Sequence, residues 1–205
     1  MNRLRRLVAV LLTAIFVWTA GPALAQDSHG WFQAGINTTD YIFHTGERGS
    51  GRRNERMSDA DELRSRVYQD SLFFPPPEGL QAISIRAKPT ARPGGMGTLS
   101  RTVPANRFRG KRVRLSADLS TERAGRVQMW MKITGPGDKV LAFDDMQSRP
   151  LRGTTRWRRY SIVLNVPANA TDITYGFLLA GSGAAYANDF AINVTPASTP
   201  VTGQP

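Results

Sequence analysis

Two adjacent carboxylates followed by a run of arginines form one stretch of the chain that could do chemistry. Asp144 and Asp145 lie in KVLAFDDMQSRPLRGTTRWRRY, residues 139–160. Adjacent residues of an extended segment point to opposite sides, so these carboxylates cannot together flank one scissile bond. Either carboxylate could instead hydrogen-bond a ligand hydroxyl or bind calcium. The alternative is that they cap the turn or pair with nearby arginines: Arg149, Arg152, Arg156, Arg158 and Arg159.

Trp130 is a second candidate for ligand contact. In RVQMWMKI, residues 126–133, the alternation of a strand places Met129 and Met131 on one face and Trp130 on the other. Gln128 and Lys132 share the face of Trp130, and sugar rings stack on such an aromatic while polar neighbours bind their hydroxyls. The sequence therefore predicts a binding site of Trp130, Gln128, Lys132, Asp144 and Asp145. Alternatively, a loop or the N-terminal region covers Trp130.

Hydrolysis is the weakest of the functional interpretations. The chain has two histidines, His29 and His44, and no cysteine. Thiol nucleophiles and cysteine-ligated metals are therefore excluded. The histidines do not have the spacing of a catalytic zinc site, and no G-x-S-x-G motif is present. We therefore expect a protein without enzymatic activity and without a cofactor.

Alternation predicts an all-β fold. Six runs place apolar residues at every second position: residues 80–87, 111–121, 126–133, 158–166, 172–181 and 185–194. In the last run, Tyr186, Phe190 and Ile192 are expected on one face. Turn signals such as GPGDK and VPANAT separate the runs. This pattern is typical of an antiparallel β-sandwich or barrel.

The N-terminal residues predict export. Arg3, Arg5 and Arg6 precede a short apolar run that ends in ALA at residues 23–25, which is the pattern of a signal peptide. We expect cleavage after residue 25 and a periplasmic or extracellular protein with no transmembrane segment. One domain would follow over 26–194, with an irregular insertion at 48–79 that carries one short helix from Ser58. A disordered tail is expected over 195–205.

The charge of the chain suggests the kind of partner. It has 27 basic and 16 acidic residues, and loss of the three leader arginines leaves a net charge of +8. An exported basic protein without a nucleic-acid motif is better matched to an anionic component of the cell envelope than to nucleic acid. A basic surface that binds an acidic partner is therefore the alternative to saccharide binding. Solubility alone would also account for this charge.

Several long motifs resemble a known bacterial module. GMGTLSRTVPANRFRGKRVRLSADLSTE, VQMWMKITGP, the 139–160 stretch and ITYGFLLAGSGAAYANDF are similar to the galactose-binding-like jelly roll of secreted proteins, also found joined to regulators of the AraC class. The resemblance covers Gly97 to about Val194, and GWFQAG resembles the first strand. It implies a jelly-roll β-sandwich and a role in binding rather than catalysis.

The final strand departs from the pattern of that module. Where the module carries Trp-x-Asp-Asp, this chain has YAND, with Tyr186 in place of Trp and Asn188 with Asp189 in place of the acidic pair. Related sandwiches hold a structural calcium near this strand. Asp189 is thus a weak candidate metal ligand, and the loss of one carboxylate argues against the site.

Overall fold

The computed structural model describes residues 30–45 and 82–202. Nearly all of the described secondary structure is β-strand, with three short 3-10 turns. The strands are β1 (Phe32–Ile36), β2 (Tyr41–His44), β3 (Ile83–Ala87), β4 (Met96–Pro104), β5 (Arg112–Thr134), β6 (Val140–Asp144), β7 (Leu151–Asn165), β8 (Asp172–Ala180) and β9 (Ala184–Thr195). The 3-10 turns are η1 (Thr38–Asp40), η2 (Asn106–Phe108) and η3 (Pro136–Asp138). The predicted leader and the insertion with its helix lie outside the described residues.

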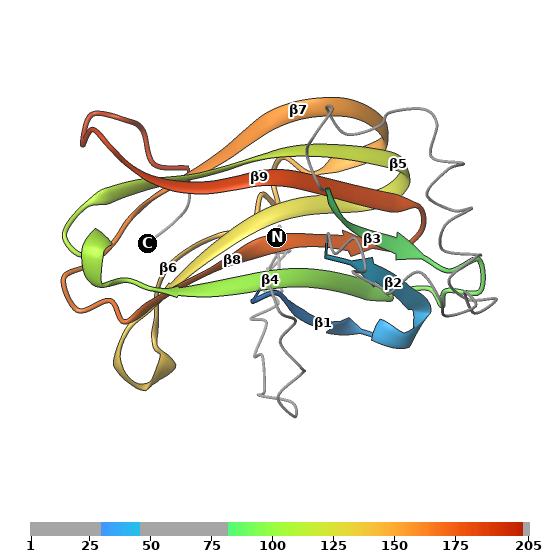
Figure 1. Cartoon of the computed structure of the whole chain (residues 1–205), viewed down its shortest axis with the longest axis horizontal. Helices are drawn as coiled ribbons and strands as arrows, with labels where there is room; N and C mark the ends of the chain where they lie inside the picture. The colour runs from blue at the N-terminus through green and yellow to red at the C-terminus, as the bar shows by residue number, and fades with distance from the viewer. Residues whose placement is uncertain (1–29, 46–81, 203–205) are drawn as a thin grey trace, which may run out of the picture.

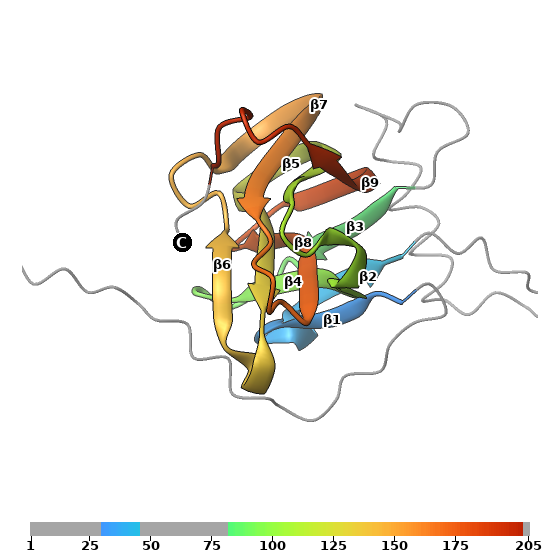
Figure 2. The ribbon, with the colours of Figure 1, turned by 90° about the vertical axis from the view of Figure 1, so that its left-hand side faces the viewer.

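Strand β5 joins two layers into one antiparallel sandwich. The hydrogen-bonded order is β1-β4-β8-β5-β9-β3-β2, and β6 and β7 also pair with β5. The first half of β5 pairs with β7 and β9, whereas its second half pairs with β8 and β6. Figures 1 and 2 show β5 running to one end of the sandwich, turning and returning in the other layer. The two runs predicted at 111–121 and 126–133 are therefore one bent strand.

The core lies between the layers, where the alternating apolar residues meet. The largest fully buried side chains come from both halves of β5 and from its partners, and they include Leu115, Leu119, Met129, Phe177 and Ile162. At about 25 cal/mol for each Å² of buried apolar surface, this contact is the main force that holds the layers together. The prediction of an all-β antiparallel sandwich is confirmed.

A bulge in β9 corrects one predicted face. Asp189 has a positive φ of 50°, and the pairing of β5 with β9 shifts between Ser116 and Asp118. Such an extra residue reverses the alternation that follows it. Phe190 consequently packs with Phe177, with ring centroids 6.2 Å apart, whereas Tyr186 lies on the outer face.

The C-terminal segment is ordered as far as it is described. Thr202 donates its amide to the Val163 carbonyl at 2.9 Å, and its hydroxyl accepts the Val163 amide at 2.8 Å. Arg112 also donates to the carbonyls of Ala197 and Thr199. The predicted disorder from residue 195 is therefore wrong up to Thr202, because these polar contacts hold the segment against β7. No helix in the described part of the chain is long and apolar enough to cross a membrane.

Candidate functional site

Trp130, Gln128 and Lys132 share one outer face of the sandwich, but this face is not an open stacking surface. The Trp130 side chain is only 6% exposed, and its Nε1 donates to Thr98 Oγ1 at 3.2 Å. Gln128 is 2% exposed and donates from Nε2 to the Asp145 carbonyl at 2.7 Å. Stacking on a sugar requires an accessible ring, so the expectation of an exposed Trp130 is wrong.

Asp144 holds the loop between β6 and β7 rather than facing a groove. It pairs with Met131 and therefore lies on the core side of β6. Its carboxylate accepts from Arg149 at 2.6 Å and from the Met146 amide at 2.8 Å. Burial alone would raise the pKa of Asp144, but hydrogen bonds from Arg149, Thr202 and Met146 outweigh it, so the pKa lies below its ordinary value.

Asp145 also acts within this loop. Its Oδ1 accepts the Gln147 amide at 3.0 Å, and its carbonyl accepts from Gln128. The five predicted site residues are therefore neighbours, as expected, but the contacts of Gln128, Trp130 and both aspartates stabilise the sandwich. Asp144 thus caps the turn and pairs with Arg149, and Asp145 caps the turn, as the alternative interpretation of the two aspartates predicted.

The surroundings of Asp189 do not suit calcium. Arg159 donates to Asp189 Oδ2 at 2.6 Å, to Asp118 Oδ2 at 3.2 Å and to Ser116 Oγ at 3.0 Å. A guanidinium thus stands among the oxygens that a cation would need. Within residues 30–45 and 82–202, no group of three or more His, Cys, Asp or Glu side chains could hold a metal ion.

The other outer face, formed by β2, β3, β9 and the first half of β5, carries a row of polar side chains. Strand register aligns His44, Ser84, Tyr186 and Ser120 across the four strands. The next row along places Arg86 of β3 and Glu122 of β5 on either side of Ala184. Arg86 and Glu122 lie two strands apart, and their long side chains meet across the small side chain of Ala184.

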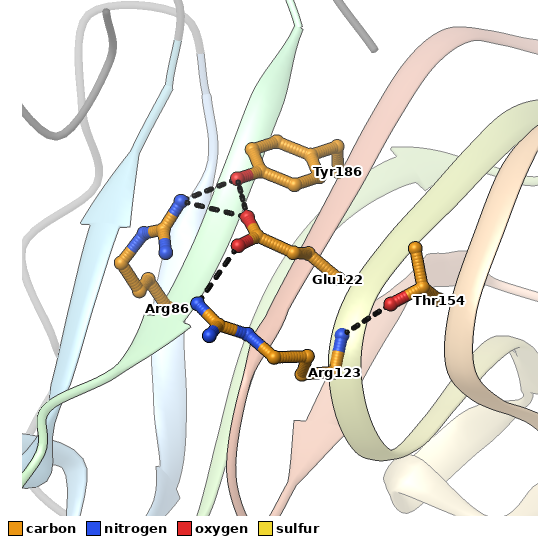
Figure 3. Close-up of polar contacts among 5 residues, drawn as sticks. All are labelled: Arg86, Glu122, Arg123, Thr154 and Tyr186. Carbon is orange, nitrogen blue, oxygen red and sulfur yellow. Dashed lines mark hydrogen bonds and ion pairs between the residues drawn. The ribbon is translucent and has the colours of Figure 1, made fainter. Parts of the chain in front are cut away.

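Arg86, Glu122 and Tyr186 form a closed network within these rows (Figure 3). Arg86 donates from Nη2 to the Tyr186 hydroxyl at 2.5 Å and to Glu122 Oε2 at 3.4 Å. The Tyr186 hydroxyl donates in turn to Glu122 Oε2 at 3.3 Å. The Arg86 guanidinium also lies 6.0 Å from the centroid of the Tyr186 ring, within the range of a cation–π contact. All three side chains are half-buried, so the network fixes their positions while leaving part of each exposed.

Arg123 extends the network toward the bend of β5. It donates from Nη2 to Glu122 Oε1 at 3.0 Å, and its amide donates to Thr154 Oγ1 at 3.0 Å. Its φ of 46° is left-handed, a conformation that costs a residue with a side chain about 1–2 kcal/mol. Gly183 makes this bend possible, because a Cβ there would lie 2.3 Å from the Arg123 carbonyl oxygen.

This arrangement suits binding better than acid–base chemistry. Both oxygens of Glu122 accept hydrogen bonds, from Arg86 and Tyr186 on one side and from Arg123 on the other. A carboxylate held by two guanidinium groups is a poor general base. His44, the histidine in the described residues, lies in the same row and is half-buried. His29 lies outside the described residues.

Sequence reasoning missed this cluster because its members are far apart along the chain. Glu122 lies 36 residues from Arg86 and 64 from Tyr186. The one signal was the YAND motif, where Tyr186 replaces the tryptophan of the resembling module. A polar residue in an alternating strand indicates an outward side, but it does not identify its neighbours in other strands.

Comparison with known proteins supports the fold and part of the resemblance. No family model matches this chain. The chain is 36% identical over 110 residues to the uncharacterised HTH-type transcriptional regulator YbfP of Bacillus subtilis, a match that covers 53% of this chain and 37% of that protein. The chain thus spans little more than a third of the length of this relative. A relative of the helix-turn-helix class agrees with the predicted resemblance to modules joined to such regulators.

Two solved structures superpose on this chain at low sequence identity. The enzymatically active domain of tailspike protein 4 of bacteriophage CBA120 superposes with a TM-score of 0.51 and 12% identity, covering 86% of this chain and 21% of that chain. The C-terminal family 22 carbohydrate-binding module of Clostridium thermocellum Xyn10B superposes with a TM-score of 0.47 and 13% identity, covering 86% of this chain and 91% of that one. The tailspike domain therefore shares the fold of this chain.

Proposed function

We propose that this protein is a non-catalytic binding module that holds a saccharide or similar polar ligand on the outer face around Tyr186. The observation that carries this proposal is the hydrogen-bonded network of Arg86, Glu122 and Tyr186 on a sheet face directed away from the core. The proposed site therefore lies on the layer opposite the one that Trp130 and its neighbours occupy.

The chemistry of the face matches a sugar in two respects. A half-buried tyrosine ring offers an apolar surface, and the half-buried guanidinium of Arg86 offers hydrogen-bonding groups beside it. Sugar rings have apolar faces and hydroxyl edges, so they need both kinds of contact at once. The network also limits side-chain motion before binding, which lowers the entropy cost of ordering the site.

A panel of envelope and plant-wall oligosaccharides, measured by calorimetry, tests the proposal. We expect at least one glycan to bind the native protein and to bind Tyr186→Ala at least about tenfold more weakly, since both a ring contact and hydroxyl contacts are lost. Tyr160→Ala is the matched control, because Tyr160 is a half-buried tyrosine that pairs with Ala117 on the core side of β7. Absence of binding to every glycan, or equal loss in both variants, would overturn the proposal.

Export is a separate part of the proposal. It is supported by the leader-like residues 1–25, which lie outside the described part of the chain. Expression in a Gram-negative host followed by mass spectrometry of the periplasmic fraction measures the mature N-terminus. We expect Gln26 to be the first residue, and a full-length chain in the cytoplasm would contradict export.

A further inference from the structure

We infer that the site around Tyr186 selects saccharides that carry a carboxylate and that Arg123 is the residue that recognises it. This inference rests on the proposed function and adds the ligand's charge to it. Three independent features carry it: the charge of the cluster, the exposure of one guanidinium and the strained backbone that holds it.

The cluster has more positive charge than it neutralises internally. Arg86 and Arg123 supply two guanidinium groups, whereas Glu122 supplies one carboxylate, which leaves a net charge of +1. A further guanidinium is tied to the same bend, because Arg152 Nη1 donates to the Gly125 carbonyl at 2.9 Å. Two other acidic groups on this face, Asp118 and Asp189, are both paired with Arg159. The end of the site near the bend is therefore positive.

The cluster also has more hydrogen-bond donors than acceptors. Glu122 already accepts at both oxygens, so a ligand would find mainly N–H and O–H groups. A surface rich in donors and positive charge fits a ligand rich in acceptors and negative charge.

Arg123 is the member of the cluster that is free to reach a ligand. Its side chain is 81% exposed, compared with 24% for Arg86, and it contacts Glu122 through Nη2. A guanidinium has five donors in a fixed fork, and that fork matches the two oxygens of a carboxylate. Within the described residues the guanidinium makes this one contact, which leaves the other donors of its fork available.

The backbone around Arg123 is fixed even though the side chain is exposed. The amide of Arg123 is bound by Thr154 Oγ1, and the Gly125 amide donates to the Ser182 carbonyl at 3.0 Å. Gly183 packs directly against the Glu122 and Arg123 carbonyls. Glycine or asparagine would adopt the left-handed conformation of this position at lower cost than arginine. An arginine held there in strain is accounted for if its guanidinium contributes a contact that the smaller residues lack.

Paired oligosaccharides that differ only in charge test the inference. Tetramers of galacturonic, glucuronic and mannuronic acid are each compared with their carboxyl-reduced, neutral forms by calorimetry on the full chain. We expect at least one acidic tetramer to bind about tenfold or more tightly than its reduced form, as befits a charge-assisted hydrogen bond. This preference should shrink as salt rises, because Arg123 is exposed.

Variants assign the preference to one residue. Arg123→Gln should bring the affinities of the acidic and the reduced tetramer to within about twofold of each other, and Arg123→Lys should restore part of the preference because the charge returns without the fork. Arg107→Gln is the control, since Arg107 is an exposed arginine in η2, which precedes β5 at the other end of the sandwich.

The outcomes separate this inference from the proposed function. Equal binding of acidic and reduced tetramers, or a preference that survives Arg123→Gln, overturns the role of Arg123. Binding of neutral glycans from the wider panel without binding of any acidic tetramer also overturns the role of Arg123. If no glycan of either kind binds, the proposed function fails, and the inference fails with it.

Discussion

The two outer faces of the sandwich each present an aromatic residue, and they use it differently. Trp130 is enclosed, and its indole N–H donates to Thr98 Oγ1, which in turn donates to the Phe177 carbonyl at 2.9 Å. Tyr186 stays half-buried and shares its hydroxyl with Arg86 and Glu122. An aromatic whose polar atom is satisfied by its own sheet contributes to stability, whereas one within an exposed, charged network is available to a ligand.

The largest expected effect concerns Trp130. Replacement with alanine removes a large buried side chain, so Trp130→Ala should lower the free energy of unfolding by about 3–5 kcal/mol. Chemical denaturation measures the change, and Trp157→Ala is the control, since the half-buried Trp157 should cost less. If Trp130→Ala kept native stability and abolished glycan binding, the assignment of the two faces would be reversed.

An intermediate effect is expected for Asp144, whose side chain is 5% exposed and pairs with the more exposed Arg149. Asp144→Ala should cost about 2 kcal/mol at neutral pH, less than a fully buried pair because Arg149 can regain water. Asp145→Ala should cost under about 1 kcal/mol, because that carboxylate has one amide contact at 3.0 Å.

The same pair predicts a dependence on pH. The pKa of Asp144 is lower in the folded protein than in the unfolded chain, so its stabilisation is complete above the unfolded value of about 4 and is lost as pH falls through the folded value. The difference in stability between native protein and Asp144→Ala should therefore narrow in acid. A constant difference from pH 7 to pH 2 would contradict the lowered pKa.

An effect on stability smaller than that of Asp144→Ala is expected at Tyr186. Tyr186→Phe keeps the ring and removes the hydroxyl, so it should cost only about 0.5–1.5 kcal/mol of stability. The free energy of glycan binding should change by a larger fraction than the free energy of unfolding, since the Tyr186 hydroxyl orients Arg86. Thermal unfolding and calorimetry on one preparation provide both numbers. A loss of stability as large as that of Trp130→Ala would make Tyr186 a structural residue as well.

Patterns within short stretches of the sequence correctly predicted which side of a strand a residue occupies and which residues could be its nearby partners. Period-two alternation placed Met129 in the core and Trp130 on the opposite face, and Arg149, which pairs with Asp144, was one of the five nearby arginines expected as partners. Alternation assigns a side of the sheet but not what covers that side, so the burial of Trp130 was not decided. The bulge at Asp189 changed the face of Tyr186 relative to Phe190, because a single left-handed residue leaves little trace in composition.

The candidate site depends on pairing between distant strands, and that is why the sequence did not reveal it. Arg86, Glu122 and Tyr186 belong to β3, β5 and β9, which become neighbours only in the folded sheet. A single sequence contains no direct record of such register. The motif at 139–160 resembles a jelly-roll module and so predicted the fold. Its carboxylates, Asp144 and Asp145, make hydrogen bonds within the loop between β6 and β7.

The length of β5 has a consequence for how the protein unfolds. Its 23 residues form hydrogen bonds with β6, β7, β8 and β9, so neither layer can lose this strand without exposing the other. We therefore expect one cooperative unfolding transition rather than separate melting of two sheets. The amide protons in the middle of each half of β5 should exchange with solvent most slowly, through global opening alone. The bend at Arg123, where these ladders are interrupted, would then be the point at which the most protected strand of the fold contacts the proposed ligand.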